Sequence, residues 1–332
     1  MRLELRGHPI HTRALSVVVE QRADGGLLAT ADLLDLRKRG FTPVGSELQG
    51  AGVIHQMGLE AEIAGGVLTA LRPRQPVVAF EASPATRGES CRDVVPGLTA
   101  LLGTDLASAA AALRGVMGGA AGCSHLLAAA QLLFATLAGM EPLPPCDASA
   151  VQRRVLRRDL LFDGSELADG GMGVAVQLSD LRSAPAADEA RPGERFARHD
   201  ELRLSLDLQG WPAQIAAIGG AERRREAGDF VGGAWRDLAT KLAPLSGMSL
   251  GKGAGQGLAA ALAGHAPLRD ALLQLGPALI QCRASFPDKW LNVAMTTPAH
   301  DGLIGMPDSC YMWRRGGALQ RIREERKLRE ES

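Results

Sequence analysis

Apolar and polar residues alternate along the first part of the chain, which is the pattern of strands with one buried face. Residues 13–37 (RALSVVVEQRADGGLLATADLLDLR) hold two such stretches around the turn Asp24-Gly25-Gly26, a hairpin signal. A third alternating stretch covers about 55–64, and an apolar stretch follows over 67–82. The sequence therefore predicts an antiparallel sheet near the N-terminus.

Two Ala/Leu-rich segments come next, at about 105–117 and 125–138. Their apolar residues recur at helical spacing, so each predicts a helix. Because the strands come first and the helices after them, this order favours an α+β fold over a wound parallel sheet.

The same succession of signals returns later in the chain. Residues 154–182 repeat the hairpin, with Asp169-Gly170-Gly171 in the place of the first turn, and 200–211 repeat the alternation of 55–66. A second Leu/Gly-rich region then resembles the first helical one. We therefore predict two tandem, pseudo-symmetric copies with a fused-dimer origin, each an antiparallel sheet followed by two helices.

The Pro-rich segment EPLPPCDAS (141–149) is the expected linker. We place the first copy at 1–145 and a divergent second copy at 146–332. The second copy continues into an extension and a tail, QRIREERKLREES, whose alternating charges predict a solvated helix.

Composition limits the classes of protein to consider. The 332 residues are 46% hydrophobic and formally neutral, so a sizeable core is expected, and only 4% are aromatic, which argues against nucleic-acid binding. The N-terminus lacks the features of a signal peptide, and the longest apolar run, 126–138, is too short to cross a bilayer. Five widely spaced cysteines suit reduced thiols, so we expect a soluble cytoplasmic protein without a membrane partner.

Several short motifs together resemble a bacterial family of unknown function, DUF2889. They are PIHTR (9–13), DGGLLATADLLD (24–35), EASPATRGESCRDVVPGL (81–98), LLGTDL and GCSHL (122–126), and DSCYMW (308–313) resembles the closing segment of the family, with Tyr311 in the place of a histidine. The resemblance covers the first copy well and the second weakly, which implies a divergent tandem duplication. Members of this family resemble components of bacterial gene clusters that degrade aromatic compounds and steroids.

Cys123 and His125 stand at the start of the second predicted helix, where Ser124 is a good N-cap. The free N–H groups and dipole of a helix start favour a thiolate at Cys123 and a neutral imidazole at His125, which could act as a base or a metal ligand. The alternative is a small buried cysteine beside a histidine that hydrogen-bonds to the backbone.

Cys91, Cys123, His125 and Cys310 would form a metal site if they converge, but none of them has the tight spacing typical of one. We therefore expect no cofactor, with a metal as the alternative. GMSLGKG (247–253) is one residue too short for a phosphate loop and has Gly253 where Ser or Thr would hold Mg²⁺. We find neither the dinucleotide fingerprint nor the nucleophile elbow of hydrolases.

Two further groups of residues are candidates. His55 and Asp200 occupy matching positions and could face a common cleft, or could simply lie at the surface where strands begin. The extension brings Trp290, Tyr311 and Trp313 close in sequence to Arg314, which suits the wall of a pocket for an aromatic ligand with an anionic group, or a core anchor. Arg13 of the PIHTR motif is a further candidate for substrate binding.

Elimination and the family context together lead to a functional hypothesis. We predict a cofactor-independent catabolic enzyme, a lyase that breaks a carbon–carbon bond of a hydrophobic phenolic molecule and releases a small aldehyde such as formaldehyde. His125, His55 and Arg314 would be catalytic, with Cys123 modulating, in a cleft between the copies of a monomeric pseudo-dimer or a homodimer. The alternatives are a non-catalytic small-molecule-binding or assembly protein, and a Cys/His metal-dependent hydrolase.

Overall fold

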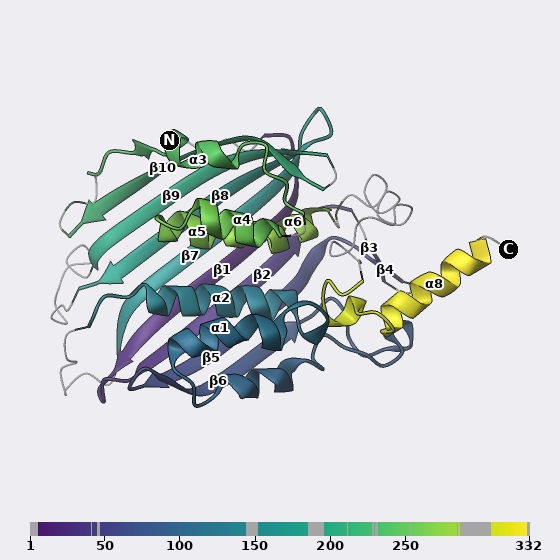
Figure 1. Cartoon of the computed structure of the whole chain (residues 1–332), viewed down its shortest axis with the longest axis horizontal. Helices are drawn as coiled ribbons and strands as arrows, with labels where there is room; N and C mark the ends of the chain where they lie inside the picture. The colour runs from purple at the N-terminus through teal and green to yellow at the C-terminus, as the bar shows by residue number, and fades with distance from the viewer. Residues whose placement is uncertain are drawn as a thin grey trace.

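In the described part of the chain, nine strands form one antiparallel sheet, in the order β11-β10-β9-β8-β7-β1-β2-β5-β6. The computed structural model describes residues 6–40, 42–44, 47–143, 152–184, 196–210, 212–227, 229, 232–251, 253–283, 285 and 307–330. Figure 1 shows the sheet as a broad layer, with α1, α2, α4, α5 and α6 lying across one of its faces.

The bounds of the strands follow the hairpin order of the chain. The strands of the large sheet are β1 (His8–Arg22), β2 (Leu27–Arg37), β5 (Gly52–Ala64), β6 (Val67–Val77), β7 (Gln152–Glu166), β8 (Met172–Ser183), β9 (Phe196–Gln209), β10 (Gln214–Glu226) and β11 (Arg236–Asp237). A separate pair consists of β3 (Thr42–Val44) and β4 (Glu47–Gln49). The helices are α1 (Leu106–Met117), α2 (Ser124–Ala138), α3 (Ala239–Leu242), α4 (Ala254–Ala261), α5 (Ala266–Leu273), α6 (Leu275–Arg283) and α8 (Ala318–Glu330).

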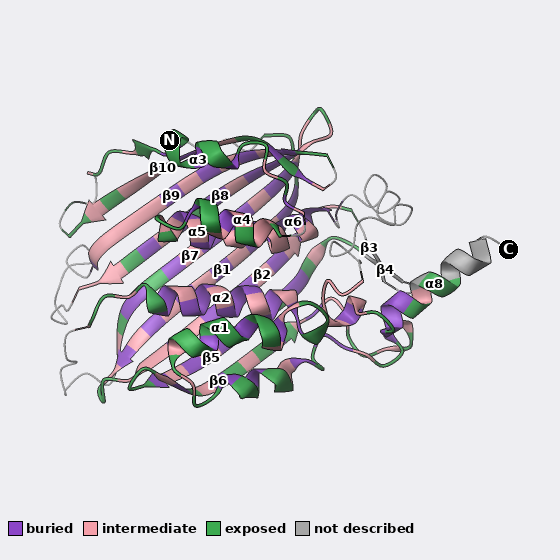
Figure 2. Cartoon of the chain, viewed as in Figure 1, coloured by how far each residue is buried: buried purple, intermediate pink, exposed green. Residues whose placement is uncertain are grey.

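The core lies between the sheet and its helices. On β1, Leu15, Val17 and Val19 are buried, while the residues between them stay partly exposed, as the period of two in a strand requires. Figure 2 shows the same alternation of buried and partly exposed bands along the neighbouring strands. One face of the sheet is therefore covered by helices and the other faces solvent.

The predicted hairpins and helices of the first part are confirmed. Asp24 Oδ1 accepts a hydrogen bond from the Gly26 amide at 2.9 Å, and Gly25 adopts a φ of +82°, which favours glycine. Asp169 caps the turn between β7 and β8 in the same way. α1 and α2 begin and end within one residue of the predicted bounds.

The predicted division into two pseudo-symmetric copies, each a sheet with two helices, is wrong. β1 pairs with β7 from His8↔Glu166 to Arg22↔Gln152, so strands from both parts of the chain form a single sheet. Separate sheets would leave an edge of unpaired N–H and C=O groups on each of these long strands, and their pairing removes both edges. In the second part of the chain, the described residues form four short helices, α3 to α6, where two were expected. A proline in the first turn of α5 marks the start of this helix as separate from α4.

Two other predictions concern the linker after the first part of the chain and the charged tail after the second. Most of the expected linker, 144–149, lies outside the described residues. The charged tail forms α8, which leads away from the sheet in Figure 1. In the described part of the chain, no helix combines the length and the apolar character needed to span a membrane.

Candidate functional site

Charged and polar residues replace apolar ones at one end of the buried face of the sheet. Arg13 on β1, Asp35 on β2 and His55 on β5 stand directly opposite one another across three adjacent strands. Arg13 and Asp35 are fully buried, and His55 is 3% exposed. These positions are in register with the core residues of the same strands, so the row lies under the helices.

Asp35 is held on both of its carboxylate oxygens. Arg13 donates through Nε to Oδ1 at 2.9 Å and through Nη2 to Oδ2 at 2.8 Å, and His11 Nε2 lies 2.9 Å from Oδ1. Burial alone would raise the pKa of Asp35, but the charge and hydrogen bonds of Arg13 outweigh it and hold that pKa well below its usual range. Asp35 is therefore an ionised carboxylate inside the core.

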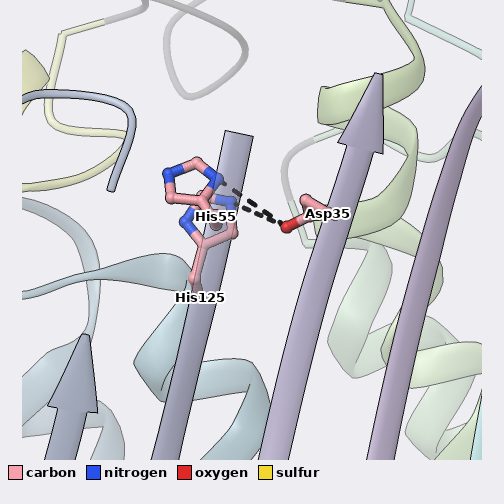
Figure 3. Close-up of side chains that lie close together, drawn as sticks. All are labelled: Asp35, His55 and His125. Atoms are coloured by element: carbon pink, nitrogen blue, oxygen red, sulfur yellow. Dashed lines mark ion pairs between the residues drawn. The ribbon is translucent and has the colours of Figure 1, made fainter. Parts of the chain in front are cut away.

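His55 and His125 stack against each other beside this carboxylate. Their ring centroids are 3.6 Å apart with an interplanar angle of 28°. Asp35 Oδ2 lies 3.8 Å from His55 Nδ1 and 3.4 Å from His125 Nε2, and Figure 3 shows one nitrogen of each ring turned to Asp35 and the other on the opposite side. Burial lowers the pKa of His55 to about 4. The pKa of His125 is lowered well below 6.5, first by burial and then by the charge that His55 would carry. Both rings are neutral at pH 7.

His125 enters the site from the first turn of α2. Its Nε2 lies 2.9 Å from the amide nitrogen of Gln281 on α6, and its Nδ1 lies 3.9 Å from Cys123 Sγ. The N-cap of α2 is Cys123 rather than the predicted Ser124. The thiolate expected at Cys123 is also not favoured, because burial raises the pKa of this thiol more than the backbone N–H groups of His125 and Leu126 lower it.

An apolar cavity of about 80 Å³ adjoins the two imidazoles. The polar residues of its lining include Arg37, His55, His125 and Gln281. The rest of its lining includes three cysteines and several apolar side chains: Cys91, Cys123, Cys310, Ile54, Phe80, Val94, Ile280, Met312 and Trp313. Phe80 and Trp313 meet edge to face with centroids 6.1 Å apart, which fixes the aromatic wall.

Comparison with protein families identifies the part of the chain that carries most of this cluster. Residues 11–138 match the family model described as protein of unknown function (DUF2889). We call these residues, which are similar to that family, the DUF2889 domain. The match contains Arg13, Asp35, His55 and His125 but does not extend beyond α2, so the tandem duplication is not confirmed. Neither the curated proteins nor the solved structures contain a match to the chain.

The structure brings most of the predicted site residues to one pocket, which is lined by the DUF2889 domain, by α6 and by residues 309–313. His55, Cys123 and His125 line it from the domain, and Tyr311 and Trp313 line it from the extension. Arg13 lies behind the pocket, where it holds Asp35. Trp290 lies outside the described residues.

Arg314 and Asp200 have other surroundings. Arg314 pairs with Glu89 at 2.8 Å, and its guanidinium carbon lies 3.8 Å from the centre of the Tyr311 ring, outside the pocket lining. Asp200 on β9 pairs with Arg198 and lines a different cleft, of about 630 Å³. His55 and Asp200 therefore do not share a cleft, which was one of the two alternatives for them, because β8, β7, β1 and β2 separate their strands.

Asp35, His55 and His125 are the described residues whose potential metal ligands lie together, all within 4.8 Å of one another (Figure 3). The expected set of three cysteines with His125 meets only along the pocket wall. The charges oppose a cation at Asp35, because both of its oxygens already accept from Arg13 and a second guanidinium, that of Arg37, lines the same pocket. These residues therefore do not fit a divalent metal ion.

Sequence reasoning missed His11, Asp35, Arg37 and Gln281. A signal for two of them exists in the DUF2889 domain, because Asp35 and Arg37 fall in phase with the buried Leu33 and so had to face the core. Gln281 comes from α6, far along the chain, and its sequence surroundings carry no sign of a site.

Proposed function

We propose that this protein is a cofactor-independent lyase of aromatic-compound catabolism. It would break a carbon–carbon bond of a hydrophobic phenolic molecule and release a small aldehyde such as formaldehyde. The observation that carries the proposal is the stacked pair of neutral imidazoles, His55 and His125, which lies against a buried carboxylate and opens on an apolar pocket. Groups of this kind with strongly shifted pKa values are typical of catalytic sites.

The pocket suits one aromatic ring. Its volume of about 80 Å³ corresponds to about five water-sized spaces at roughly 15 Å³ each. Phe80, Met312 and Trp313 offer apolar and aromatic surface, and the imidazoles and Gln281 offer polar groups. A ring in this position would displace water from the imidazoles, which favours proton transfer over side reactions.

His55 is the proposed base. Its Nδ1 faces Asp35, which favours a proton on that nitrogen and a lone pair on Nε2. His55 would take the proton from a substrate hydroxyl, and the electron pair of that O–H bond would form the new C=O bond as the neighbouring C–C bond breaks. The electron pair of the broken bond passes into the conjugated aromatic part, and the proton returns from the imidazolium. The step needs no oxidant or reductant.

Each part of the chain would contribute to this site. In the proposal, residues 1–145 supply the base and its supports, and residues 146–332 supply Gln281 and the aromatic wall around Tyr311. His125 and Cys123 would position His55, since His125 stacks on it and Cys123 lies 3.9 Å from the far nitrogen of His125. Arg314 has no place in this mechanism, because it is engaged with Glu89.

The test is release of aldehyde from a panel of phenolic compounds that carry a hydroxymethyl group next to a carbon bonded to the ring. We expect the wild-type protein to release one aldehyde per molecule converted, and His55→Gln to lower kcat by about 10²- to 10⁴-fold. His265→Gln is the matched control, since His265 pairs with Glu222 at the other cleft. Binding of the panel without any turnover by folded wild-type protein would overturn the lyase and favour the non-catalytic binder.

A further inference from the structure

Three cysteines face the pocket, and one of them has an imidazole beside it. Cys91, Cys123 and Cys310 all belong to the lining, and all three are free thiols. In the described part of the chain, Cys123 is the cysteine whose sulfur is in hydrogen-bonding contact with a histidine, because His125 Nδ1 lies 3.9 Å from its Sγ. A thiol next to an imidazole in a pocket is the arrangement of a nucleophile with its base.

Asp35 determines which nitrogen of His125 carries the proton. Its Oδ2 lies 3.4 Å from His125 Nε2 (Figure 3), so a proton on Nε2 can be donated to the carboxylate. The lone pair then remains on Nδ1, the nitrogen that faces Cys123. Gln281 lies 2.9 Å from the same Nε2, and its amide can present its oxygen to the same proton. Cys123, His125 and Asp35 therefore stand in the order of a nucleophile, a base and the group that orients the base.

Burial keeps the thiol and the imidazole neutral before they react. It raises the pKa of the Cys123 thiol and is the main reason why the pKa of His125 is lowered. The backbone N–H groups of His125 and Leu126 act on the same sulfur in the opposite direction, because they stabilise its charged form. The thiol therefore loses its proton to His125 as the sulfur attacks, rather than beforehand.

We propose that Cys123 is a nucleophile for acyl transfer, with His125 as its base and Asp35 as the residue that positions this base. The substrate class is an ester of a phenol, because the pocket has room for one ring and offers the aromatic wall of Phe80 and Trp313. This inference goes beyond the proposed lyase, since it uses the same pocket but a different reacting atom.

The reaction balances with water as the second substrate. His125 Nδ1 takes the thiol proton, the sulfur forms a bond to the carbonyl carbon, and the C–O bond of the ester breaks. The electron pair of that bond goes to the phenol oxygen, which receives the proton from the imidazolium. Water then attacks the thioester, and His125 takes a proton from this water and returns it to the departing sulfur. The products are a phenol and a carboxylic acid, and the thiol of Cys123 is restored.

The probe is 4-nitrophenyl acetate, whose leaving group is a single ring that absorbs visible light as the phenolate. We expect a burst of about one phenolate per protein molecule, followed by slower turnover, because the acyl-enzyme accumulates. Peptide mass analysis during the burst should find the acetyl group on Cys123 rather than on Cys91 or Cys310. Cys123→Ser should abolish the burst, and His125→Gln should slow it by about 10²- to 10⁴-fold. Cys282→Ala removes a buried thiol outside the lining and should keep the burst.

The outcomes can be told apart from those of the lyase. Urea denaturation of each variant shows whether it is folded, so that a lost burst reports the lost nucleophile. A wild-type protein without a burst, a burst that Cys123→Ser retains, or acetyl groups spread evenly over the three thiols would overturn the proposal. Aldehyde release is measured separately. A burst without aldehyde from the phenolic panel would support Cys123 as the nucleophile and overturn the lyase, and aldehyde without a burst would do the reverse.

Discussion

Mild acid should destabilise this protein through its buried histidines. The pKa of His55 is about 4 in the folded protein against about 6.5 in an unfolded chain, because burial disfavours the charged ring. Below pH 6.5 the unfolded state therefore binds a proton that the folded state refuses until about pH 4. Stability falls as the pH falls through this window, and it is fully present above it.

The size of the effect follows from these two values. Between pH 7 and pH 5, His55 alone should lower the free energy of unfolding by about 2 kcal/mol, at 1.36 kcal/mol per pKa unit. The pKa values of His11 and His125 are also lowered, again chiefly by burial, so they add in the same direction. Paired carboxylates such as Asp35 lose their contribution as the pH falls from the ordinary aspartate pKa of 3.8 toward the lower folded value, which lies below the range from pH 7 to pH 5.

Urea denaturation at pH 7, 6 and 5 measures this linkage. We expect the loss of unfolding free energy between pH 7 and pH 5 to be about 2 kcal/mol smaller in His55→Gln than in the parent protein. His8→Gln removes an exposed histidine at the start of β1 and should keep the full loss of the parent. If His55→Gln loses as much stability as the parent over this window, the neutral buried imidazole is refuted.

Two further predictions concern stability at neutral pH. Asp35→Asn leaves the fully buried Arg13 without its carboxylate, so unfolding in urea should cost about 3–5 kcal/mol less. Asp180→Asn should have a smaller effect, because its partner Arg158 also donates to Asp270 at 3.2 Å; equal losses would contradict this reasoning. Gly164→Ala would place a Cβ 2.3 Å from Cys282 Sγ, so it should destabilise the protein by about 1–3 kcal/mol, and most of this cost should disappear when it is made in Cys282→Ala protein. A cost that is the same in both backgrounds would exclude the clash.

The elements that the sequence predicted well are those specified by nearby residues. The turn at Asp24 and the helix start at Asp105 are each made by a side chain that caps backbone groups two or three residues away. The pairing of β1 with β7 joins residues more than a hundred positions apart, as at Arg13↔Phe162. Alternation reports which face of a strand is buried but not which strand lies beside it, so the single sheet could not be read from the pattern.

The residues of the candidate site also fall into those that the sequence indicates and those that only the fold reveals. His125 and Cys123 drew attention because two reactive residues stand at a helix start, and His55 because it begins a strand with a polar residue. Asp35 can be recognised as a site residue only from the sheet, which places Arg13 on one side of it and His55 on the other. The neighbours that give a buried charge its meaning come from the fold, so composition and spacing could not supply them.

Burial sets the strength of the proposed base. Asp35 raises the pKa values of the neighbouring imidazoles, but Arg13 lowers them and shares the carboxylate, so burial decides and the rings stay neutral and weakly basic. A general base is most effective when its pKa is near the working pH. With a pKa of about 4, His55 is neutral at pH 7 and able to accept a proton in the proposed mechanism, but it is a weak base because of its burial.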